Sequence, residues 1–377
     1  MQSPHLKYWV AFRMAPAVGR ARFELLLKAF GDLERAWGAP SEALHDAGLD
    51  ARVVAAITAV RNRIDPDAEL QRLQVAGIRV ITWDDDDYPR LLKQIYDLPP
   101  LLFVKGELLP EDERSIAVVG TRRVSAYGRE AAAYLTRDLA QRGVTVVSGL
   151  ARGVDAIAHK TALDAGGRTI AILGHGLDHL YPPEHRALAA EVASHGALVS
   201  EYPLGVRPDA QNFPRRNRIM SGMSLGTLVI EAPEGSGAIW TVRHALEQDR
   251  EVFCVPGSIF SPNSLATNLL IQQGAKLVMS YKDVLEELNL ADVAEHQLPL
   301  PMPAALVAPA DPTESAILSK LAYDPTHVDD VTRATGLPMS AVSATLALME
   351  IKGLVKQVGN MNYVRLRETT ASYGGIP

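Results

Sequence analysis

Apolar residues recur at helical spacing through roughly the first 80 residues of the chain. The pattern predicts short helices at Phe23–Phe30, Ser41–Leu44 and Ala51–Val60, with Gly and Pro residues in the turns between them. Ser41 follows Pro40 and has the side chain of a helix N-cap. We therefore expect residues 1–80 to form a small helical domain with a bundle of four or five helices.

Six short runs of apolar and β-branched residues follow, each about one strand long. They end at Val119, Val147, Leu173, Val199, Ile230 and Val255. The stretches between them have helical periodicity, for example Arg129–Arg142, Asp155–Ala165 and Trp240–Gln248. Strands that alternate with helices favour right-handed crossovers. Residues 81–296 are therefore predicted to be an α/β domain with a Rossmann-like, doubly wound, mostly parallel sheet.

The C-terminal part of the chain has a different pattern. Residues 297–312 hold five prolines without a period and are predicted to be a linker. Helices at about Thr313–Leu321, Val328–Thr335 and Met339–Glu350 and a hairpin turning at Gly359-Asn360 then predict a winged-helix domain over residues 313–368. Its third helix has no Lys, Arg, Asn or Gln. We expect it to contact protein, or only to pack, rather than to read bases.

Composition narrows the classes of protein that fit. The 377 residues carry a net charge of −6, but residues 1–230 hold 28 basic and 27 acidic side chains, so a nucleic-acid site has to be a local basic patch in that part. No apolar run is long enough to span a membrane. Residues Met1 to Gly19 have no continuous apolar stretch of the kind that a secretory signal contains. The single cysteine, Cys254, excludes an intramolecular disulfide. We expect a cytoplasmic protein.

Ligands of open parallel sheets bind beyond the carboxyl ends of the strands. Small residues and arginine follow each of the first two predicted strands: Gly120, Thr121, Arg122 and Arg123, then Ser148, Gly149, Arg152 and Gly153. Glycines let a ligand approach the backbone, and arginine and a helix N-terminus attract phosphate. Asp155 is the expected N-cap of the second of these helices. Ordinary solvated turns are the alternative for either loop alone.

The densest basic cluster of the sequence lies beside an aromatic residue. Its members are Phe213, Arg215, Arg216, Asn217 and Arg218. Arginines are unfavourable at a helix N-terminus unless an anion binds there. Guanidinium groups next to a ring are typical of single-stranded nucleic-acid sites. The alternative is a solvated helix start.

Several catalytic and cofactor motifs are absent. There is no P-loop, and Gly174-His175-Gly176 lacks the third glycine of the dinucleotide fingerprint. His159, His175, His179 and His185 have no metal-ligand spacing, so we expect no metal and no cofactor. Glu201 and Glu231 end predicted strands and would suit an acid or base. No nucleophile accompanies them, so we expect no catalytic residues.

These motifs together resemble the DNA processing protein A (DprA/Smf) family of single-stranded-DNA-binding recombination mediators. The matching stretches are Val118–Arg122 with Ser125 and Tyr127-Gly128, Ser148–Asp155 with Ala158-His159, Gly176–Asp178 with Tyr181-Pro182, Ser200–Pro203, Phe213–Ile219, Glu231-Ala232 and Arg250–Gly257. They follow one another in order over about 140 residues. The N-terminal helices resemble the family's sterile-alpha-motif-like domain, and the C-terminal module its winged helix.

The resemblance implies a non-enzymatic, dimeric protein that binds single-stranded DNA during natural transformation. It implies further that the protein loads a RecA-type recombinase past single-strand-binding protein. Carried over by motif, the two strand-end loops would cradle phosphate, and the Phe213–Arg218 cluster would contact backbone or base. Substituting Arg122 or Arg218 by Ala is then expected to weaken binding by about 1–3 kcal/mol.

The chain departs from the family pattern at several positions. Ser236 and Gly237 remain candidate DNA contacts, but they lie in Gly235–Ile239, where the family has Arg-Ser-Gly-Ser-Leu. Trp240 is unusual at its position. The stretch Asp209–Asn212 lacks a lysine that relatives often carry there.

Two other functions remain open from the sequence. A nucleotide-phosphate hydrolase resembling the lysine-decarboxylase-like phosphoribohydrolases would use the same sheet, but its Pro-Gly-Gly-x-Gly-Thr loop is represented only by Pro256-Gly257-Ser258. A transcriptional regulator would have to rely on the C-terminal module alone.

Overall fold

The computed structural model describes residues 5–290, 311–321, 325–352, 354–358 and 361–365. The chain divides into two compact units, Met1–Ala294 and Glu295–Pro377. Residues 297–310 of the predicted linker lie outside the described residues. The boundary expected near residue 80 stays a prediction. Within the described residues, no helix has the length and apolar character needed to cross a bilayer.

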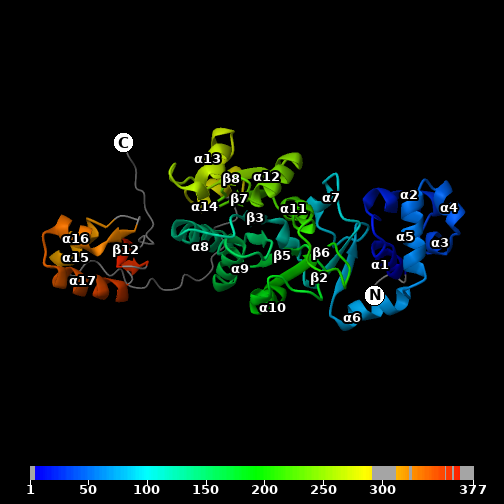
Figure 1. Cartoon of the computed structure of the whole chain (residues 1–377), viewed down its shortest axis with the longest axis horizontal. Coiled ribbons are helices and arrows are strands. Elements are labelled where there is room, and N and C mark those ends of the chain that lie inside the picture. Colours follow the sequence, from blue (N-terminus) through cyan, green and yellow to red (C-terminus); the bar gives the residue numbers. More distant parts are fainter. Residues whose placement is uncertain (1–4, 291–310, 322–324, 353, 359–360, 366–377) are drawn as a thin grey trace. The chain divides into compact units, whose positions relative to one another are not determined.

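The first unit is built around one nine-stranded sheet in the order β1-β2-β6-β5-β4-β3-β7-β8-β9 (Figure 1). Its strands are β1 (Arg79–Thr82), β2 (Leu101–Gly106), β3 (Ser115–Val119), β4 (Thr145–Ser148), β5 (Thr169–Leu173), β6 (Gly196–Ser200), β7 (Gly226–Val229), β8 (Glu251–Cys254) and β9 (Lys276–Leu277). All pairs from β6 to β9 are parallel, whereas β2 is antiparallel to both β1 and β6. The predicted Rossmann-like sheet is confirmed, and each predicted strand end lies within one residue of the observed one. The hydrophobic pattern of the sequence did not predict β1, β2 and β9.

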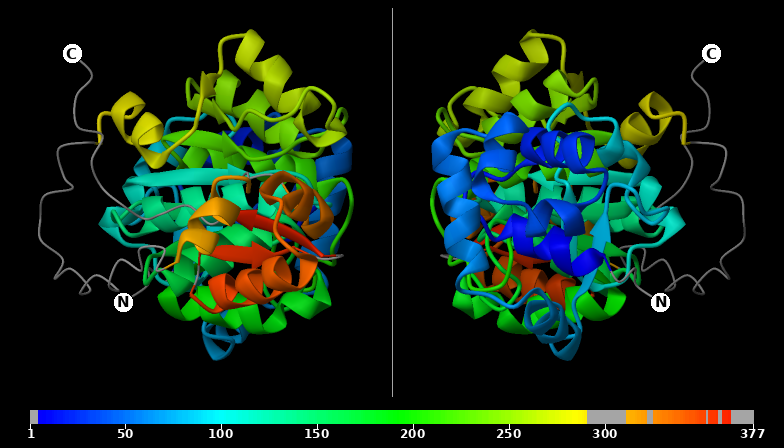
Figure 2. Two further views of the ribbon diagram at one scale, coloured as in Figure 1. Left: turned by 90° about the vertical axis from the view of Figure 1, so that its left-hand side faces the viewer. Right: turned by 90° about the vertical axis from the view of Figure 1, so that its right-hand side faces the viewer.

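Helices cover both faces of this sheet (Figures 1 and 2). One face packs against α8 (Ala126–Ala140), α9 (Val154–Asp164), α10 (Arg186–His195) and α14 (Tyr281–Glu287), and the other against α7 (Arg90–Lys93), α11 (Asn212–Met223), α12 (Ala238–Glu247) and α13 (Leu265–Gln272). Short 3₁₀ helices lie at Pro110–Glu113 (η1), Pro183–His185 (η2) and Pro262–Ser264 (η3). Both faces of the strands are apolar because both are buried: Ile116 and Val118 of β3 pack on one side and Val119 on the other.

Six helices precede the sheet, not the four or five expected. They are α1 (Leu6–Arg13), α2 (Arg20–Phe30), α3 (Leu33–Gly38), α4 (Ser41–Asp46), α5 (Ala51–Arg61) and α6 (Pro66–Val75). Their core, centred on stacked Trp9 and Phe23, continues into β1 and β2 through Val80 and Phe103. The helices therefore lie against the β1–β2 edge of the sheet (Figure 2).

The predicted N-cap at Ser41 is wrong. Pro40 has the extended backbone of the cap position, Ser41 is already helical, and no side chain caps the helix. A proline in the cap position shifts the start of the helix by one residue, so the Ser41 hydroxyl makes no cap.

The second unit has the predicted three helices followed by a hairpin. They are α15 (Pro312–Leu318), α16 (Val328–Thr335) and α17 (Met339–Ile351), and the strands are β10 (Thr326–His327), β11 (Val355–Gln357) and β12 (Asn362–Arg365). The strands form an antiparallel sheet in the order β10-β12-β11. The expected turn at Gly359-Asn360 lies outside the described residues.

Candidate nucleic-acid interface

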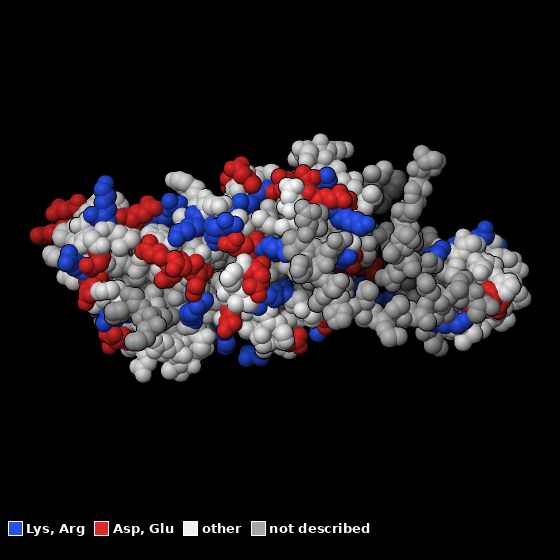
Figure 3. Space-filling view, turned by 180° about the vertical axis from the view of Figure 1, so that it is seen from behind, with Lys and Arg blue, Asp and Glu red and all other residues white. Residues whose placement is uncertain are grey.

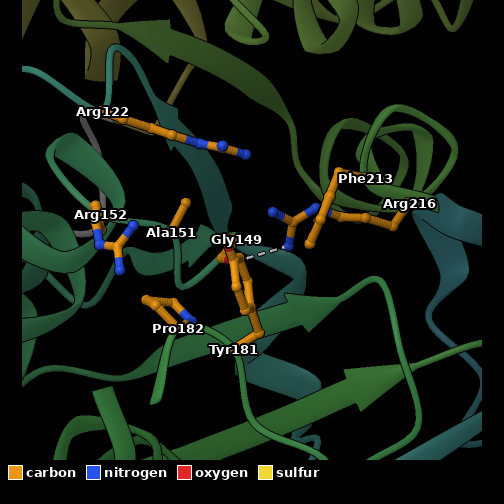
Figure 4. A pocket seen from close by; sticks show the side chains of 8 residues that line it. All are labelled: Arg122, Gly149, Ala151, Arg152, Tyr181, Pro182, Phe213 and Arg216. Carbon is orange, nitrogen blue, oxygen red and sulfur yellow. Dashed lines mark hydrogen bonds between the residues drawn. The ribbon is translucent and has the colours of Figure 1, made fainter. Parts of the chain in front are cut away.

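A groove of about 690 Å³ opens at the carboxyl ends of the parallel strands. One wall comes from the loop after β3 and the other from the start of α12, with α11 between them. A small pocket at one end is lined by Arg122, Gly149, Ala151, Arg152, Tyr181, Pro182, Phe213 and Arg216 (Figure 4). The structure therefore brings together four segments that are separated by up to about 90 residues in the sequence, at the end of the sheet where ligands of parallel sheets bind.

The glycines of the two strand-end loops hold the loops against each other. A Cβ on Gly153, which has φ +79°, would lie 2.3 Å from the Thr121 carbonyl oxygen. A Cβ on Gly120 would meet the Val154 side chain at 2.6 Å. These two positions need glycine for contacts within the protein, a requirement that the sequence pattern did not predict.

Ser148 does not reach the groove. Its side chain is fully buried, and its hydroxyl donates to the Val118 carbonyl oxygen at 2.7 Å. Asp155 is also placed differently from the prediction, since Gly153 is the N-cap of α9. The Asp155 carboxylate instead accepts from the amides of Gly149 and Ala151, at 3.2 and 3.3 Å. Ser148 therefore supports the loop from beneath, whereas Asp155 holds the loop amides and also lines the groove.

Arg216 is a buried cation beside the pocket. It is 4% exposed, and its guanidinium donates to the Gly149 carbonyl oxygen at 2.9 Å and to Asn217 Oδ1 at 3.0 Å. Among the described residues, no carboxylate forms an ion pair with it. Burial lowers the pKa of Arg216 to about 10, although the nearby Asp155 carboxylate opposes the shift. A buried charge without an ion-pair partner is costly, and an anion in the pocket would offset that cost.

Two more arginines stand at the edge of the same pocket. Arg122, from the loop after β3, and Arg152, from the loop after β4, are exposed and extend toward the pocket from other sides than Arg216 (Figure 4). The Arg152 guanidinium is paired with the Glu184 carboxylate of η2. Three guanidiniums around a small cavity suit a phosphate group, which accepts several hydrogen bonds at once.

Two aromatic rings lie beside these cations. The ring centroids of Tyr181 and Phe213 are 5.8 Å apart, and the Arg122 guanidinium lies 5.9 Å from the centre of the Phe213 ring. Tyr181 is 39% exposed, so part of its surface is open to a ligand. Flat apolar rings next to guanidiniums match the two parts of a nucleotide, its base and its phosphate.

The other members of the Phe213–Arg218 cluster have separate surroundings. Asn217 lines the groove and donates to the Gly237 carbonyl oxygen at 3.3 Å, which ties α11 to the start of α12. Arg215 is exposed and lies outside the residues that line the groove. Ser236 and Gly237 lie on the α12 wall, as expected for candidate contacts.

Arg218 lies outside the groove and is bound within the protein. Its guanidinium donates to both oxygens of Glu201, at 2.9 and 3.0 Å, and to Asp97 at 3.1 Å. Arg13 of α1 reaches the same Glu201 carboxylate at 3.5 Å. Burial alone would raise the pKa of Glu201, but Arg218 and Arg13 outweigh it and hold the pKa below its ordinary value. This network connects α1, the residue after β6 and α11.

The second candidate acid or base is equally engaged. The Glu231 carboxylate accepts from the amide and hydroxyl of Ser125 at the start of α8 and from Asn263, 3.2 Å away. Within the described part of the chain, no three His, Cys, Asp or Glu side chains lie close enough to hold a metal ion. Burial lowers the pKa of His159 to about 3 and also lowers that of His175, so both are neutral at pH 7.

Two aromatic residues of the groove were not among the predicted site residues. Tyr181 lies in the loop between β5 and η2, and Trp240 lies in the first turn of α12. An exposed aromatic residue near a strand end was the available signal, but the same pattern is also typical of core packing.

The fold and the site define a class of protein. It has a Rossmann-like domain, with a groove of arginines and aromatic rings at the carboxyl ends of its parallel strands, and a winged-helix module later in the chain. Two models of known protein families match this chain. The family described as DNA recombination-mediator protein A matches residues 79–289, and the DprA winged helix domain matches residues 301–361.

Individual relatives are similar over most of the chain. Protein Smf of Synechocystis is 36% identical over 97% of this chain and 100% of its own length. Protein Smf of Escherichia coli is 42% identical over 80% of this chain and 81% of its own. The crystal structure of DNA processing protein A from Streptococcus pneumoniae superposes with a TM-score of 0.66 at 35% identity, covering 74% of this chain and 97% of that one. The chain belongs to the DNA recombination-mediator protein A (DprA/Smf) family.

Proposed function

We propose that the groove binds single-stranded DNA, with a backbone phosphate over Arg216 and between Arg122 and Arg152. The observation that carries this proposal is the buried Arg216 guanidinium, which has no ion-pair partner among the described residues and lies beside an open pocket. A base adjacent to that phosphate would stack on Tyr181 and Phe213. Such stacking needs a base face that a duplex keeps covered, so the groove favours a single strand.

A relative supports the choice of ligand. The structure of DNA processing protein A from Helicobacter pylori is described as giving insight into a unique single-stranded DNA binding mode. The match between the two structures covers 57% of this chain and 96% of the Helicobacter pylori chain, with a TM-score of 0.51 at 27% identity.

The proposal is tested by fluorescence anisotropy with labelled single- and double-stranded oligonucleotides of the same sequence. Wild type should bind the single strand more tightly. Arg216→Met, which keeps the side-chain volume, should weaken binding by about 2 kcal/mol, and Arg122→Ala by about 1 kcal/mol. Arg186→Ala, a surface control on α10, should bind as wild type does. Equal affinity of all four proteins, or a preference for duplex, would refute the proposal.

We propose further that the bound strand is handed to a RecA-type recombinase, past single-strand-binding protein. Membership of a recombination-mediator family supports this step. The test is the DNA-dependent ATPase of the recombinase on DNA already coated with single-strand-binding protein. Wild type should shorten the lag before hydrolysis, and Arg216→Met should not. A lag that wild type leaves unchanged would count against mediation.

A homodimer is the proposed assembly, and an exposed apolar edge supports it. Leu265 and Leu269 of α13 are 42% and 45% exposed, and Leu277 of the edge strand β9, which follows α13 in the chain, is 39% exposed. Apolar side chains on an uncovered sheet edge are typical of an interface. Leu269→Glu should convert a dimer to a monomer in light scattering, whereas Leu246→Glu on α12 should not. A monomeric wild type would refute this assembly.

The protein is proposed to bind DNA without altering it chemically. Both carboxylates that could act as acid or base, Glu201 and Glu231, are held by partners within the protein. Incubation with nucleoside monophosphates should release no free base. Release that disappears in Glu231→Gln would favour the phosphoribohydrolase alternative instead.

A further inference from the structure

Trp240 differs from the other tryptophans of the chain in its surroundings. Trp9, Trp37 and Trp83 pack in the N-terminal core, where Trp9 contacts Trp83 and Trp37 contacts Phe12 edge to face. Trp240 is 47% exposed and lines the groove that also holds Arg122, Phe213 and Arg216. An indole ring that is half open to the groove is therefore available to a ligand there.

The groove-lining surface around Trp240 suits a base better than a phosphate. The residues of this wall that line the groove are Pro233, Ser236, Gly237, Ala238, Trp240 and Thr241, and none of them is charged. The cations of the groove all come from the opposite wall and from α11. A strand lying in the groove can therefore place its phosphates toward the arginines and a base toward the indole.

One neighbour of Trp240 reinforces this arrangement. The Arg243 guanidinium, one turn along α12, lies 5.1 Å from the centre of the indole ring. A cation at that distance is attracted to the ring and helps to fix its orientation at the groove.

We propose that Trp240 forms a second base-stacking position, so that the DNA path crosses the groove from the Tyr181–Phe213 pair, over Arg216, to the α12 wall. This inference rests on the proposed function, since it extends the same binding site. Stacking of a base on an aromatic ring depends little on sequence. The second position therefore lengthens the bound segment without selecting particular bases.

The test uses intrinsic fluorescence together with affinity. A thymidine oligonucleotide of about 16 nucleotides, the upper end of typical single-domain site sizes, is titrated into wild type, Trp240→Ala, Trp240→Phe and Trp240→Leu. Wild-type emission should be quenched on binding, and the three variants should lose that quenching because the other tryptophans are in the core. Affinity should fall about tenfold for Trp240→Ala and Trp240→Leu and stay within about threefold for Trp240→Phe.

A second oligonucleotide separates stacking from a backbone contact. An oligomer of the same length made of abasic nucleotides keeps the phosphates and lacks the bases. Wild type and Trp240→Ala should bind it equally. A tenfold difference on the abasic oligomer would show that Trp240 acts through the backbone and would overturn the inference.

The outcomes distinguish this inference from the proposed function. If wild type binds no single strand in the anisotropy assay, the proposed function has failed. If wild type binds more tightly than Arg216→Met, while Trp240→Ala binds as tightly as wild type without a quenching difference, only the second stacking position has failed.

Discussion

At the scale of single residues, one short segment of α11 carries four different tasks. Phe213 offers a ring, Arg216 a buried cation, Asn217 a tie to α12, and Arg218 a bond to Glu201. The sequence predicted the cluster but not this division. Successive helical positions turn by about 100°, so adjacent arginines point to different surroundings that only the packed fold defines. The expectation that Arg218 contacts DNA is therefore replaced by a structural role.

This division predicts opposite effects for two similar substitutions. Arg218→Met removes both hydrogen bonds from the buried Glu201 carboxylate and leaves it with the longer ion pair to Arg13 at 3.5 Å, so it should lower the free energy of unfolding by about 3 kcal/mol. Arg216→Met removes a buried cation that makes no ion pair, and should leave that free energy nearly unchanged while weakening DNA binding by about 2 kcal/mol. Urea unfolding of both variants, combined with anisotropy, checks the pair. The reverse pattern would contradict the assignment.

His159 predicts a loss of stability in acid. It is fully buried in α9, and burial holds its folded-state pKa at about 3, against an ordinary value of about 6.5. The unfolded chain therefore takes up a proton that the folded chain refuses as the pH falls from about 6.5 toward 3. Stability should fall by about 1.4 kcal/mol per pH unit in that window.

Urea unfolding at pH 7.5 and 5.5 measures this loss of stability. His159→Gln should show a smaller difference between the two pH values than wild type. The matched control is His195→Gln, at an exposed position, which should behave as wild type does. An unchanged pH dependence in His159→Gln would assign the acid sensitivity to other groups.

At the scale of elements, strands were predictable and caps were not. Buried parallel strands are short apolar runs, so their ends were placed to within one residue. The N-caps expected at Ser41 and Asp155 were wrong because a preceding proline or glycine already holds the cap conformation. The edge strand β9 was missed because it is only two residues long. The loops after β3 and β4 fit against each other through contacts between residues far apart in the sequence. The order of residue types along the chain does not predict such contacts.

The loop after β4 gives a prediction with a matched control. A Cβ on Gly149 would lie 2.0 Å from the Arg216 guanidinium, which is the mobile end of a long side chain. Gly149→Ala should therefore displace the guanidinium and weaken DNA binding by about tenfold, with less than about 1 kcal/mol of lost stability. Gly120→Ala meets backbone and a β-branched side chain instead, and should mainly destabilise the fold. Thermal unfolding and anisotropy together measure both effects.

The 3₁₀ helix η2 predicts a gain of affinity. Its Glu184 is paired with Arg152 and competes with a phosphate for that guanidinium. Glu184→Gln should tighten single-strand binding several-fold at low salt, because Arg152 no longer has to exchange partners. Glu191→Gln on α10, which pairs with Lys160, is the control and should have no effect. Weaker binding by Glu184→Gln would mean that the pair instead orients Arg152 for its ligand.

At the scale of the whole molecule, binding cannot come from a general positive field. The net charge is −6, and acidic and basic side chains are interspersed over the face shown in Figure 3. The attraction for a phosphate is therefore local, and its source is the pocket at the end of the groove, where Arg122, Arg152 and Arg216 meet. Such a small number of phosphate contacts predicts a shallow dependence of affinity on salt.

The most direct test of this account is the slope of log Kd against log salt concentration for wild type and Arg216→Met on the same thymidine oligonucleotide. Three phosphate contacts predict a slope of about 2 for wild type, and loss of one predicts about 1.4 for Arg216→Met, together with weaker binding throughout the series. Identical slopes and affinities for the two proteins would show that Arg216 holds no phosphate and would contradict the central claim.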